Sequence, residues 1–586
     1  MSVQKRITIL LSLLAFSCIA TNAAISKTVN HNGIFYDVDV DATNVSVTKP
    51  VGVNNPYEHY KGTVNIPTSI TLEGKTYSVT KISSQAFRSQ SGLTMVVIPK
   101  TIEEIADRAF WGCVNLKSVA LASNGVLTSI EKEAFYGCTK ISSITLPNSL
   151  VYLGESAFHD CESLKSVKYG NSIEVIDHNA FQGCQSLTEF IAPASLKRIG
   201  NYAFWNCANI KKVVMNDGLE EIGNDAFLQC SGLDDLSLGN TVKKIGYEAF
   251  RWCLGLKSVV IPNSVEEMGY STFRYCTGLE NVTLGNALKE IPAYCFEQAI
   301  IKSIEIPNSV TAIGLLAFSE CPLEDIKWGN SVETIGEESF CKTNIETLNL
   351  PEPLKCIRSN AFRECGNLTE ITMPATMLEI QSGAFLKCKN LKHVYLHALT
   401  PPSIDRASTK PFERCNNPVI VHLYEGLKDL YESSIEWSEN IKATNEKGKI
   451  ELVDDMPALK VESISIEGAP YYCGIGETGV ATATIYPVNA FSRELSWSSS
   501  DDTILYIDEF SGFYVGFQEG TVTITATATD GSGVTASATV YVTDVSGIET
   551  VNLNTKSNTI FNIQGQKLSV PMKGINIING KKVLKR

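Results

Sequence analysis

The side chains that could do chemistry in this sequence fall into regularly spaced groups, of which the first is aromatic. The one or two positions after a recurring Phe hold Trp111, Tyr136, His159, Trp205, Arg251, Trp252, Arg274 and Tyr275. Protein interfaces and sugar-stacking surfaces use aromatic rings and guanidinium groups. Packing of large side chains over neighbouring repeats is the simpler explanation of this stripe, and a discontinuous ligand-binding ridge is the other.

A second group is a ladder of cysteines. Twelve of the 17 cysteines stand three residues after a recurring Phe: Cys113, Cys138, Cys161, Cys184, Cys207, Cys230, Cys253, Cys276, Cys321, Cys365, Cys388 and Cys415. In an exported protein such a series suggests disulfides. The same slot holds Gln90, Ala299 and Thr343 in other copies, which indicates a tolerant packing position. We therefore predict buried free thiols rather than disulfides.

An acidic group near the N-terminus has part of the pattern of a metal site. Asp37, Asp39 and Asp41 have the spacing that begins a calcium-binding loop. Ala42 and Thr48 stand where that loop needs a glycine and a bidentate glutamate. We therefore interpret the segment as a strand with a polar face.

His393, Tyr395 and His397 form a comparable group, because alternate residues of a strand point to the same face. A solvated strand near the end of the repeats explains them more simply than a metal site does. The sequence has no His-Glu-x-x-His, Cys-x-x-Cys, Gly-x-Ser-x-Gly or phosphate-loop pattern. We predict no metal, no cofactor and no enzymatic activity.

The elements that must position these residues are the repeats that carry the recurring Phe. It stands at intervals of 22 to 25 residues, at Phe87, Phe110, Phe135, Phe158, Phe181, Phe204, Phe227, Phe250, Phe273, Phe296, Phe318, Phe340, Phe362 and Phe385. Phe412 is consistent with a degraded fifteenth copy. In one unit, Val167 and Tyr169 predict a short strand and Gly170 a turn. One unit cannot close a core, so stacked copies predict a parallel-stranded solenoid.

These repeats resemble the BspA-type leucine-rich repeats of bacterial surface proteins. In the unit Cys253–Phe273 the shared positions are Leu256, Val259, Ile261, Pro262, Ser264, Val265 and Gly269. Met268 and Thr272 depart from the family pattern. The resemblance implies a mainly β fold, a leucine-rich-repeat solenoid of about 14–15 repeats with caps. It also implies a role in adhesion, which such proteins perform toward host matrix proteins and other bacteria.

Solenoids usually bind ligands on a concave sheet and on the loops along its edge. The positions that flank the inward residue of each predicted strand are small and mixed in charge, and the candidates for binding are Lys168, Lys212, Asp235 and Tyr395. No patch of a single sign is predicted, which argues against a highly charged ligand.

The N-terminus has the pattern of a secretory signal peptide. Lys5 and Arg6 precede a mostly apolar run, Ile7–Ala20, that is followed by small residues. We predict cleavage after Ala23, with lipidation of Cys18 as the less favoured alternative. The sequence has no apolar run of about 18 residues, so it predicts no transmembrane helix.

Composition changes after the repeats. Residues 460–544 are rich in Thr, Ser and Val and alternate as strands do, which predicts a β-sandwich. Trp497, Asp501 and the run Gly520–Ala526 resemble group 2 bacterial immunoglobulin-like domains, which often act as spacers. The predicted divisions are a signal peptide (1–23), an N-terminal β cap (24–80), the repeats (81–422), a cap helix and linker (423–459), the immunoglobulin-like domain (460–544) and a C-terminal segment (545–586). The cap helix is predicted over Glu425–Ile441.

The C-terminal segment differs in charge from the rest of the chain. Residues Gly547–Arg586 hold seven basic residues and one acid, and short apolar runs flank glycine-containing turns. A small basic β-module is the plain interpretation. The segment also resembles the C-terminal sorting signals of type IX secretion cargo in Bacteroidota, which implies export or attachment at the cell surface.

Composition narrows the class of function. The formal net charge of -13 argues against nucleic acid as a partner, and 44% hydrophobic with 19% charged residues excludes a disordered chain. We expect an extracellular, surface-displayed and monomeric binding protein, an adhesin whose solenoid binds a host or bacterial protein. A surface glycan-binding protein for nutrient capture is the alternative, and an enzyme with an unrecognised site is less favoured.

Overall fold

The computed structural model describes residues 27–39, 41–404, 409–415, 418–444, 448–457, 460–486, 490 and 492–544, together with four short strands between 560 and 585. The predicted signal peptide, 1–23, lies outside the described residues. Two compact units make up the chain. The first holds the residues up to Val394 with Pro402–Val419 and Glu439–Glu451, and the second holds the remainder.

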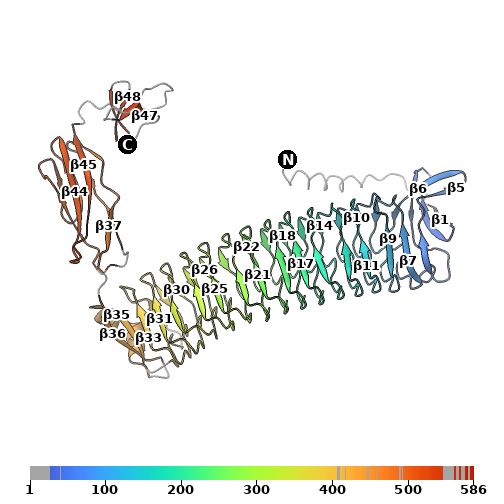
Figure 1. Ribbon diagram of the computed structural model, residues 1–586, viewed down its shortest axis with the longest axis horizontal. Helices are drawn as coiled ribbons and strands as arrows, with labels where there is room; N and C mark the ends of the chain where they lie inside the picture. Colours follow the sequence, from blue (N-terminus) through green and yellow to red (C-terminus); the bar gives the residue numbers. More distant parts are fainter. Residues whose placement is uncertain are drawn as a thin grey trace. The chain divides into compact units, whose positions relative to one another are not determined.

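Antiparallel strands begin the first unit (Figure 1). The strands before the repeats are β1 (Lys27–His31), β2 (Ile34–Val38), β3 (Asn44–Val47), β4 (Gly62–Asn65), β5 (Ser69–Leu72) and β6 (Lys75–Ile82). Strands β1, β2 and β3 pair in antiparallel order, and β3 then pairs with β6 in parallel. Since β6 also pairs in parallel with β8 of the first repeat, this β layer covers the open end of the solenoid.

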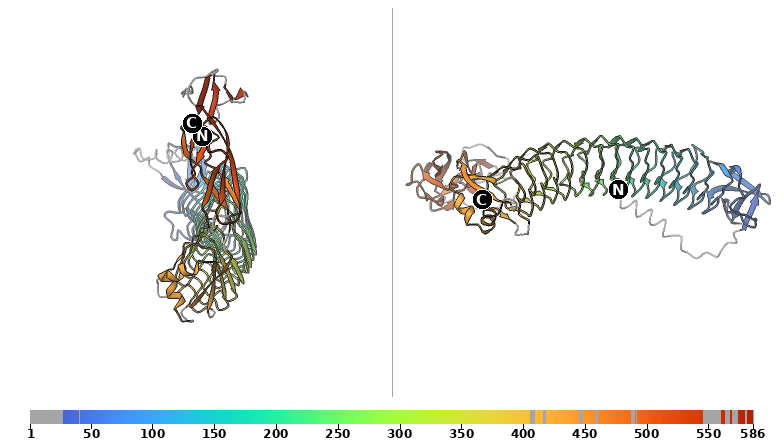
Figure 2. Two further views of the ribbon diagram at one scale, coloured as in Figure 1. Left: turned by 90° about the vertical axis from the view of Figure 1, so that its left-hand side faces the viewer. Right: turned by 90° about the horizontal axis from the view of Figure 1, so that it is seen from below.

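The repeats form a β-solenoid in which each turn contributes one strand to each of two rows (Figures 1 and 2). The long-strand row consists of β7 (Leu93–Ile98), β9 (Ser118–Leu121), β11 (Ser143–Thr145), β13 (Ser166–Lys168), β15 (Glu189–Ile191), β17 (Lys212–Met215), β19 (Asp235–Leu238), β21 (Ser258–Val260), β23 (Asn281–Thr283), β25 (Ser303–Glu305), β27 (Asp325–Lys327), β29 (Thr347–Asn349), β31 (Glu370–Met373) and β33 (His393–Leu396). The short-strand row consists of β8 (Glu104–Ile105), β10 (Ser129–Ile130), β12 (Tyr152–Leu153), β14 (Val175–Ile176), β16 (Arg198–Ile199), β18 (Glu221–Ile222), β20 (Lys244–Ile245), β22 (Glu267–Met268), β24 (Glu290–Ile291), β26 (Ala312–Ile313), β28 (Thr334–Ile335), β30 (Cys356–Ile357), β32 (Glu379–Ile380) and β34 (Ser403–Ile404).

The recurring Phe residues form the spine of the core. All fifteen rings from Phe87 to Phe412 are buried, and each stacks on the next with centroids 4.8 to 5.7 Å apart. Phe412 therefore continues the stack as a fifteenth copy. At the other end Tyr60 packs on Phe87 at 4.7 Å. Fifteen stacked units share one core that a single repeat could not close.

The twelve ladder cysteines are buried beside this spine, and every thiol donates a hydrogen bond to the Phe carbonyl of the preceding turn at 2.9 to 3.4 Å. The same carbonyl also accepts from a backbone N–H of its own turn, as Phe110 does from Cys113 at 3.1 Å, so the thiol occupies its second lone pair. In the Thr343 copy the hydroxyl donates to the carbonyl of Phe340 in the same turn. The slot therefore favours a small hydrogen-bond donor, which Cys and Thr both provide.

The short-strand row is interrupted at one place. Its first sheet ends at β22 and a second begins at β24. In neighbouring turns the residue after the short strand donates its N–H to the preceding turn, as Gly269 does to the Ile245 carbonyl at 2.9 Å and Gly314 to the Ile291 carbonyl at 2.8 Å. Pro292 occupies this position at the interruption and has no N–H to donate. We call this interruption the Pro292 seam.

Two short helices follow the repeats, where the sequence predicted one helix over Glu425–Ile441. They are α2 (Lys428–Ser433) and α3 (Ile435–Ile441), flanked by β35 (Val419–Tyr424) and β36 (Ile450–Met456). Ser434 separates them because its backbone is extended, with φ -69° and ψ 130°. Tyr431 is buried and donates to the Ala398 carbonyl at 2.7 Å.

The second unit also contains two facing sheets. One has the order β38-β45-β44-β41 and the other β39-β43-β42, with β37 and β40 as a separate pair. Their bounds are β37 (Ser463–Ile466), β38 (Tyr472–Gly474), β39 (Thr478–Val480), β40 (Ala483–Tyr486), β41 (Leu495–Ser499), β42 (Leu505–Ile507), β43 (Phe513–Gly516), β44 (Gly520–Ala528) and β45 (Thr535–Thr543). Trp497, Ile507, Tyr514, Ile524 and Val540 belong to the core between the two sheets.

Four strands are described in the C-terminal segment: β46 (Ile560–Asn562), β47 (Lys567–Leu568), β48 (Gly574–Ile578) and β49 (Lys581–Lys585). They form one sheet in the order β47-β46-β48-β49. Among the described residues of the whole chain, no helix has the length and hydrophobicity needed to cross a membrane.

Candidate binding surface

The candidate aromatic residues lie in the tight turn that contains each recurring Phe. Around Phe204, the backbone of Tyr202 and Asn206 is left-handed, with φ of 58° at both. Phe204 N donates to the Ala226 carbonyl of the next turn at 2.8 Å. Phe204 and the preceding Ala203 are buried, and the partly exposed side chains of this turn therefore lie in register from repeat to repeat. We call the surface that they form the turn face.

The predicted ridge is not one stripe, because its residues occupy two different slots of the turn. Trp111, Tyr136, His159, Trp205, Arg251 and Arg274 directly follow the Phe, whereas Trp252 and Tyr275 stand one position later. Trp252 and Tyr275 are in left-handed backbone, with φ of 60° and 61°. Consequently the eight side chains form three separate groups.

The first group is a stack near the N-terminal end of the solenoid. Arg88 lies over Trp111 at 4.8 Å, Trp111 stacks on Tyr136 at 5.8 Å, and Tyr136 stacks on His159 at 4.6 Å. Burial and the nearby Asp160 carboxylate raise the pKa of Tyr136. All of these rings are half-buried against one another, which is the packing role that the sequence favoured.

The second group, which we call the Arg-aromatic cluster, alternates cations and rings. Arg251 lies 4.3 Å from the Trp252 ring and 5.4 Å from the Tyr275 ring. Arg274 lies 4.6 Å from both Tyr275 and Tyr294. The two guanidinium groups are held by ion pairs, Arg251 to Glu248 at 2.7 Å and Arg274 to Glu297 at 2.6 Å. The cluster is therefore a rigid, partly exposed surface of stacked planar groups.

Trp205 stands apart from both groups. Its Nε1 donates to Gln229 Oε1 at 3.1 Å, and its ring tilts against Tyr202 at 5.6 Å. In the turn between Trp205 and the Arg-aromatic cluster, Leu228 occupies the slot after the Phe and is buried.

Sequence reasoning missed the most exposed aromatic pair of the turn face. Tyr247 and Tyr270 stack at 4.9 Å with an interplanar angle of 1° and are 39% and 49% exposed. Each stands three residues before its Phe, directly after Gly246 or Gly269. Those glycines are required because a Cβ on Gly269 would lie 2.1 Å from the Tyr247 backbone N. A Gly-Tyr dipeptide in consecutive repeats was the signal that could have identified the pair.

A shallow hollow of about 370 Å³ lies beside this pair. Its lining combines Arg198, Lys244, Glu221, Glu267 and the polar residues His178, Asn201 and Asn224. Hydrogen bonds link turns along it: Asn201 N donates to His178 Nδ1 at 2.8 Å, and Tyr247 N donates to Asn224 Oδ1 at 3.2 Å.

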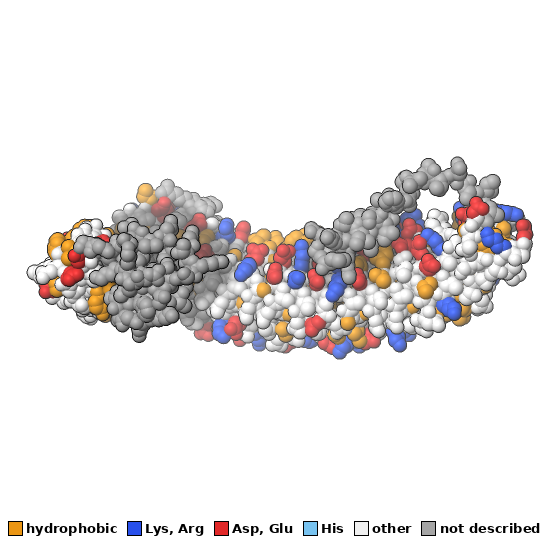
Figure 3. All heavy atoms as spheres, turned by 90° about the horizontal axis from the view of Figure 1, so that it is seen from above, with side chains coloured by type: hydrophobic (Ala, Val, Ile, Leu, Met, Phe, Trp, Pro, Cys, Tyr) orange, Lys and Arg blue, Asp and Glu red, His pale blue; other side chains and the backbone are white. Residues whose placement is uncertain are grey.

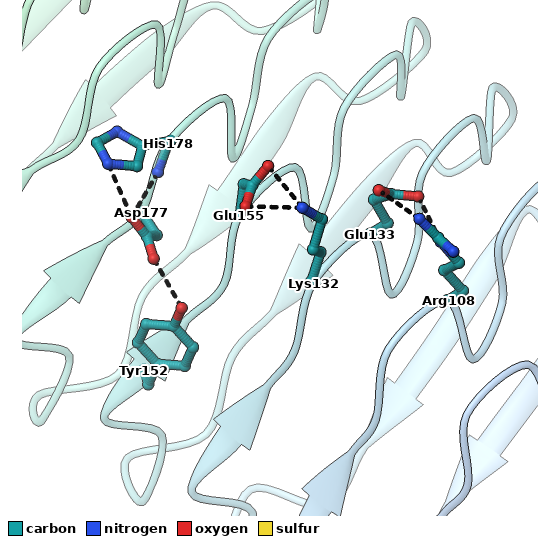
Figure 4. Close-up of polar contacts among 7 residues, drawn as sticks. All are labelled: Arg108, Lys132, Glu133, Tyr152, Glu155, Asp177 and His178. Atoms are coloured by element: carbon teal, nitrogen blue, oxygen red, sulfur yellow. Dashed lines mark hydrogen bonds and ion pairs between the residues drawn. The ribbon is translucent and has the colours of Figure 1, made fainter. Parts of the chain in front are cut away.

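In the repeats nearer the N-terminus, charge pairs and hydrogen bonds link neighbouring turns in the same way (Figure 4). Arg108 pairs with Glu133 at 2.8 Å, and Lys132 pairs with Glu155 at 2.9 Å. The Tyr152 hydroxyl donates to Asp177 Oδ2 at 2.7 Å. On the face shown in Figure 3, basic and acidic side chains alternate along the solenoid and neither sign gathers into a patch.

One carboxyl group on the turn face is unusual. Asp225 is 5% exposed, and burial together with the neighbouring Glu248 raises its pKa to about 6. A hydrogen bond with Tyr202 and the charge of Arg251 act in the opposite direction. In sequence, Asp225 lies between Trp205 and the Arg-aromatic cluster. Because its pKa is about 6, its charge changes near neutral pH beside these candidate binding residues.

The other predicted candidates lie elsewhere. Lys212 and Asp235 are on neighbouring strands β17 and β19 and pair with each other at 2.8 Å. Lys168 lines a hollow of about 650 Å³ on the long-strand row. Tyr395 stacks on His422 at 4.4 Å, and His422 contacts Asp455 at 2.8 Å.

These four residues do not join the turn face. The eight turn-face candidates and Lys168, Lys212, Asp235 and Tyr395 therefore do not form a single site.

Within the described residues, no group of three or more His, Cys, Asp or Glu side chains could hold a metal ion. Asp37, of the calcium-like spacing, accepts a hydrogen bond from Thr28 at 2.6 Å.

The solved structures that are similar to this chain include three bacterial proteins. A leucine-rich repeat protein of Bacteroides ovatus is 26% identical, with 63% of this chain and 94% of that chain covered and a TM-score of 0.47. The pneumococcal vaccine antigen PcpA is 21% identical, with 73% and 100% covered and a TM-score of 0.37. A leucine rich cell surface protein of Faecalibacterium prausnitzii is 21% identical, with 63% and 94% covered and a TM-score of 0.33.

Two uncharacterised proteins of Clostridium acetobutylicum are each 39% identical over 69 and 70 residues. These matches cover 12% of this chain in both cases, and the chain spans only 7% and 17% of the length of those curated relatives.

The family model of the BspA type leucine rich repeat region matches residues 80–211, 197–324 and 311–442. These ranges run without a gap from residue 80 to residue 442, which is more than half of the 586-residue chain. This chain therefore belongs to the BspA type leucine rich repeat family.

Proposed function

We propose that this is an exported, monomeric cell-surface adhesin whose solenoid binds a protein of a host or of another bacterium. The observation that supports this most is the Arg-aromatic cluster. Arg, Trp and Tyr are the side chains that dominate binding energy at protein interfaces. Here they are stacked and ion-paired before any ligand arrives, so little side-chain entropy is lost on binding.

The slot that Trp252 and Tyr275 occupy is not reserved for aromatic residues, since Ser89, Asp160 and Lys342 stand there in other turns. Trp252 and Tyr275 are in left-handed backbone, which disfavours a residue with a Cβ by about 1 kcal/mol. Gly112, Gly137 and Gly183 occupy the same slot in other turns, also at positive φ. The fold therefore does not need an aromatic residue there.

The segments before and after the solenoid have patterns that suit an exported surface protein. We infer a signal peptide at 1–23, a cap at 24–80, the binding solenoid at 81–422 and a second cap at 423–459. Residues 460–544 would serve as an immunoglobulin-like spacer, and 545–586 as a sorting signal for export. The alternation of strands in 460–544 and the basic charge of 547–586 support these assignments. No cofactor and no enzymatic role are proposed.

A glycan is the second candidate ligand, and one observation favours it. Tyr247 and Tyr270 expose their stacked rings beside a hollow whose lining mixes hydrogen-bond donors and acceptors with balanced charge. Neutral, hydroxyl-rich ligands suit such a surface better than charged ones do.

The test is a binding screen of the mature chain against matrix proteins, mucins and a glycan array. The variant Trp252→Gly/Tyr275→Gly removes two rings with a residue that the slot accepts. Trp111→Gln is the matched control, since Gln182 occupies that slot in another turn. We expect at least a tenfold loss of affinity for a protein ligand in the first variant only. Unchanged binding in the first variant, or equal losses in both, would remove the cluster as the site.

The glycan alternative gives a different pattern. Replacing Tyr247 and Tyr270 with Ser would then abolish glycan binding, while Trp252→Gly/Tyr275→Gly would leave it intact. Absence of any saturable ligand across the whole panel would count against the adhesin function itself.

A further inference from the structure

The second unit has an exposed apolar surface that its own fold does not require. Val480 on β39 lies opposite Phe513 on β43, and Tyr506 on β42 lies opposite Val515. Val480, Tyr506 and Phe513 are all exposed. Residues opposite each other on paired strands share one side of the sheet, so these four form the outer side of the sheet β39-β43-β42. We call it the aromatic face.

The aromatic face continues beyond the strands. Phe510, in the turn between β42 and β43, is 81% exposed. That turn is well ordered, because Asp508 Oδ1 accepts from Ser511 N at 2.9 Å and from the Ser511 hydroxyl at 2.6 Å. Phe517, directly after β43, is also exposed. The exposed rings therefore stand on a fixed scaffold.

The opposite sheet of the same unit shows what an ordinary outer face looks like here. The partly exposed positions of β44 are Thr521, Thr523, Thr525 and Thr527, and those of β45 include Thr535, Ser537 and Thr539. An antiparallel sheet with one solvated face normally alternates apolar and polar residues in this way. Strand β43 reads Phe-Tyr-Val-Gly instead and is apolar on both sides. The opposite sheet also carries an aromatic group at β38, but its rings of Tyr471, Tyr472 and Tyr541 pack on one another. The extent of exposed apolar surface on the aromatic face indicates a partner.

Charge identifies what kind of partner fits. Residues 460–544 hold eleven acidic residues and two basic ones, Lys460 and Arg493. Glu477, Asp508 and Glu509 lie in the segments that join the three strands of the aromatic face or lead into them. A surface that is apolar at its centre and acidic at its margin suits an apolar partner with basic margins.

The chain carries such a partner itself. Residues 547–586 hold seven basic residues and one acid. Their four strands pair into one sheet, and apolar residues such as Phe561, Ile575, Ile577 and Leu584 stand in these strands among the basic residues. A single sheet layer that is rich in apolar residues gains stability when another layer packs against it.

We propose that the C-terminal sheet β47-β46-β48-β49 docks against the aromatic face of the preceding domain as a third layer, held by opposite charge. The fifteen residues 545–559 join the two and can span about 50 Å when extended, which is enough to reach any side of the domain. A tether of this length keeps the segment at an effective concentration near the millimolar range, so weak docking is sufficient. This inference is independent of the solenoid's ligand.

The docked state would decide when the C-terminal segment is available to other proteins. While docked, the segment is covered by the aromatic face and part of its positive charge is neutralised. Competition by another binding partner, or screening of the charges by salt, would release it. The docking therefore acts as a latch on the segment.

The experiment uses the full mature chain with a photo-crosslinking residue, benzoylphenylalanine, in place of Phe510. We expect irradiation to link this position to residues 560–585 of the same chain, at a yield independent of protein concentration. The control places the same residue at Tyr486, an exposed aromatic position on β40 outside the aromatic face. We expect no links to residues 560–585 from that position.

A charge-reversed chain separates specific docking from chance proximity. Lys581→Glu/Lys582→Glu/Lys585→Glu should lower the crosslinking yield at least fivefold, and hydrogen exchange of β42 and β43 should rise about tenfold. Links that grow with protein concentration would show docking between copies and overturn the latch. Links to other parts of the chain, or an exchange pattern unchanged by the charge reversal, would overturn it too.

Discussion

Raising the pH above 8.5 should destabilise the solenoid, because the thiol ladder is buried as neutral groups. Burial raises the pKa of nine ladder thiols above the ordinary value, and for Cys276 to about 12. An unfolded Cys has a pKa of about 8.5. Above that pH the unfolded chain releases protons that the folded chain retains. The stabilisation is therefore fully present below pH 8.5 and is lost as the pH rises.

The size of the effect follows from the number of thiols. One pH unit above the unfolded pKa, each retained proton lowers the free energy of unfolding by about 1.4 kcal/mol. Cys388 is left out of the sum because it is coupled to Cys365, whose pKa is lowered. The other eight thiols together give about 11 kcal/mol at pH 9.5, which is comparable with the whole stability of a typical domain. Unfolded Tyr and Lys side chains titrate only near pH 10 and above, so the interval from 8.5 to 9.5 reports on Cys.

The assay is urea unfolding followed by far-UV circular dichroism at half-unit steps from pH 7 to pH 9.5. We expect a flat stability up to about pH 8 and a steep fall beyond it. Cys207→Thr, which imitates the Thr343 copy, removes one titrating group and should reduce the loss at pH 9.5 by about 1.4 kcal/mol. A stability independent of pH up to 9.5 would refute the reasoning, and so would near-zero free thiols in the denatured, unreduced chain.

Three further perturbations test other parts of the same structure. Gly269→Ala should lower the free energy of unfolding by about 3 kcal/mol, because its Cβ would collide with the Tyr247 backbone. The control, Gly366→Ala, places a Cβ in open space and should be neutral in the same urea titration. Asp225→Asn should raise the free energy of unfolding at pH 7 by about 1 kcal/mol and leave it unchanged at pH 4. The reason is the raised pKa of Asp225: its contribution to stability is present below about pH 4 and is lost as the pH rises through about 6. Phe227→Ala should lower the free energy of unfolding by about 4 kcal/mol by opening a gap in the ring stack; a loss below 1 kcal/mol would mean that the stack contributes little.

The sequence predicted the solenoid well because its signal is repeated. The recurring Phe, the buried Cys slot and the inward Ile residues recur together every 22 to 25 residues, so errors at single positions do not matter. Phe412 illustrates this, since its interval from Phe385 is irregular but its ring stacks at 5.5 Å like the others. The short-strand row was not predicted, because two residues are too few to show a strand pattern.

The candidate site was harder to predict because it depends on backbone conformation as well as spacing. Sequence alone placed Trp205 and Trp252 in one stripe, although one position in a tight turn moves a side chain into a different slot. The helix expected over 425–441 failed for a similar reason. Its apolar spacing continues through Ser434, but the extended backbone at that residue ends α2 and starts α3 anew.

The Pro292 seam has a mechanical consequence. Backbone hydrogen bonds between neighbouring turns run along the solenoid axis, so a pull on its ends loads them one after another rather than all at once. Where Pro292 stands, the short-strand row contributes no pairing between β22 and β24, while bonds such as Ser271 N to the Ala293 carbonyl remain. The long-strand row also lacks pairing at several turn boundaries, two of which, β19/β21 and β23/β25, lie on either side of the seam. Because three consecutive boundaries are incomplete here, we expect the solenoid to open in this region under tension. The parts of the solenoid before and after Pro292 would then separate while each stays folded, and the gap would lie beside Tyr270 and the Arg-aromatic cluster.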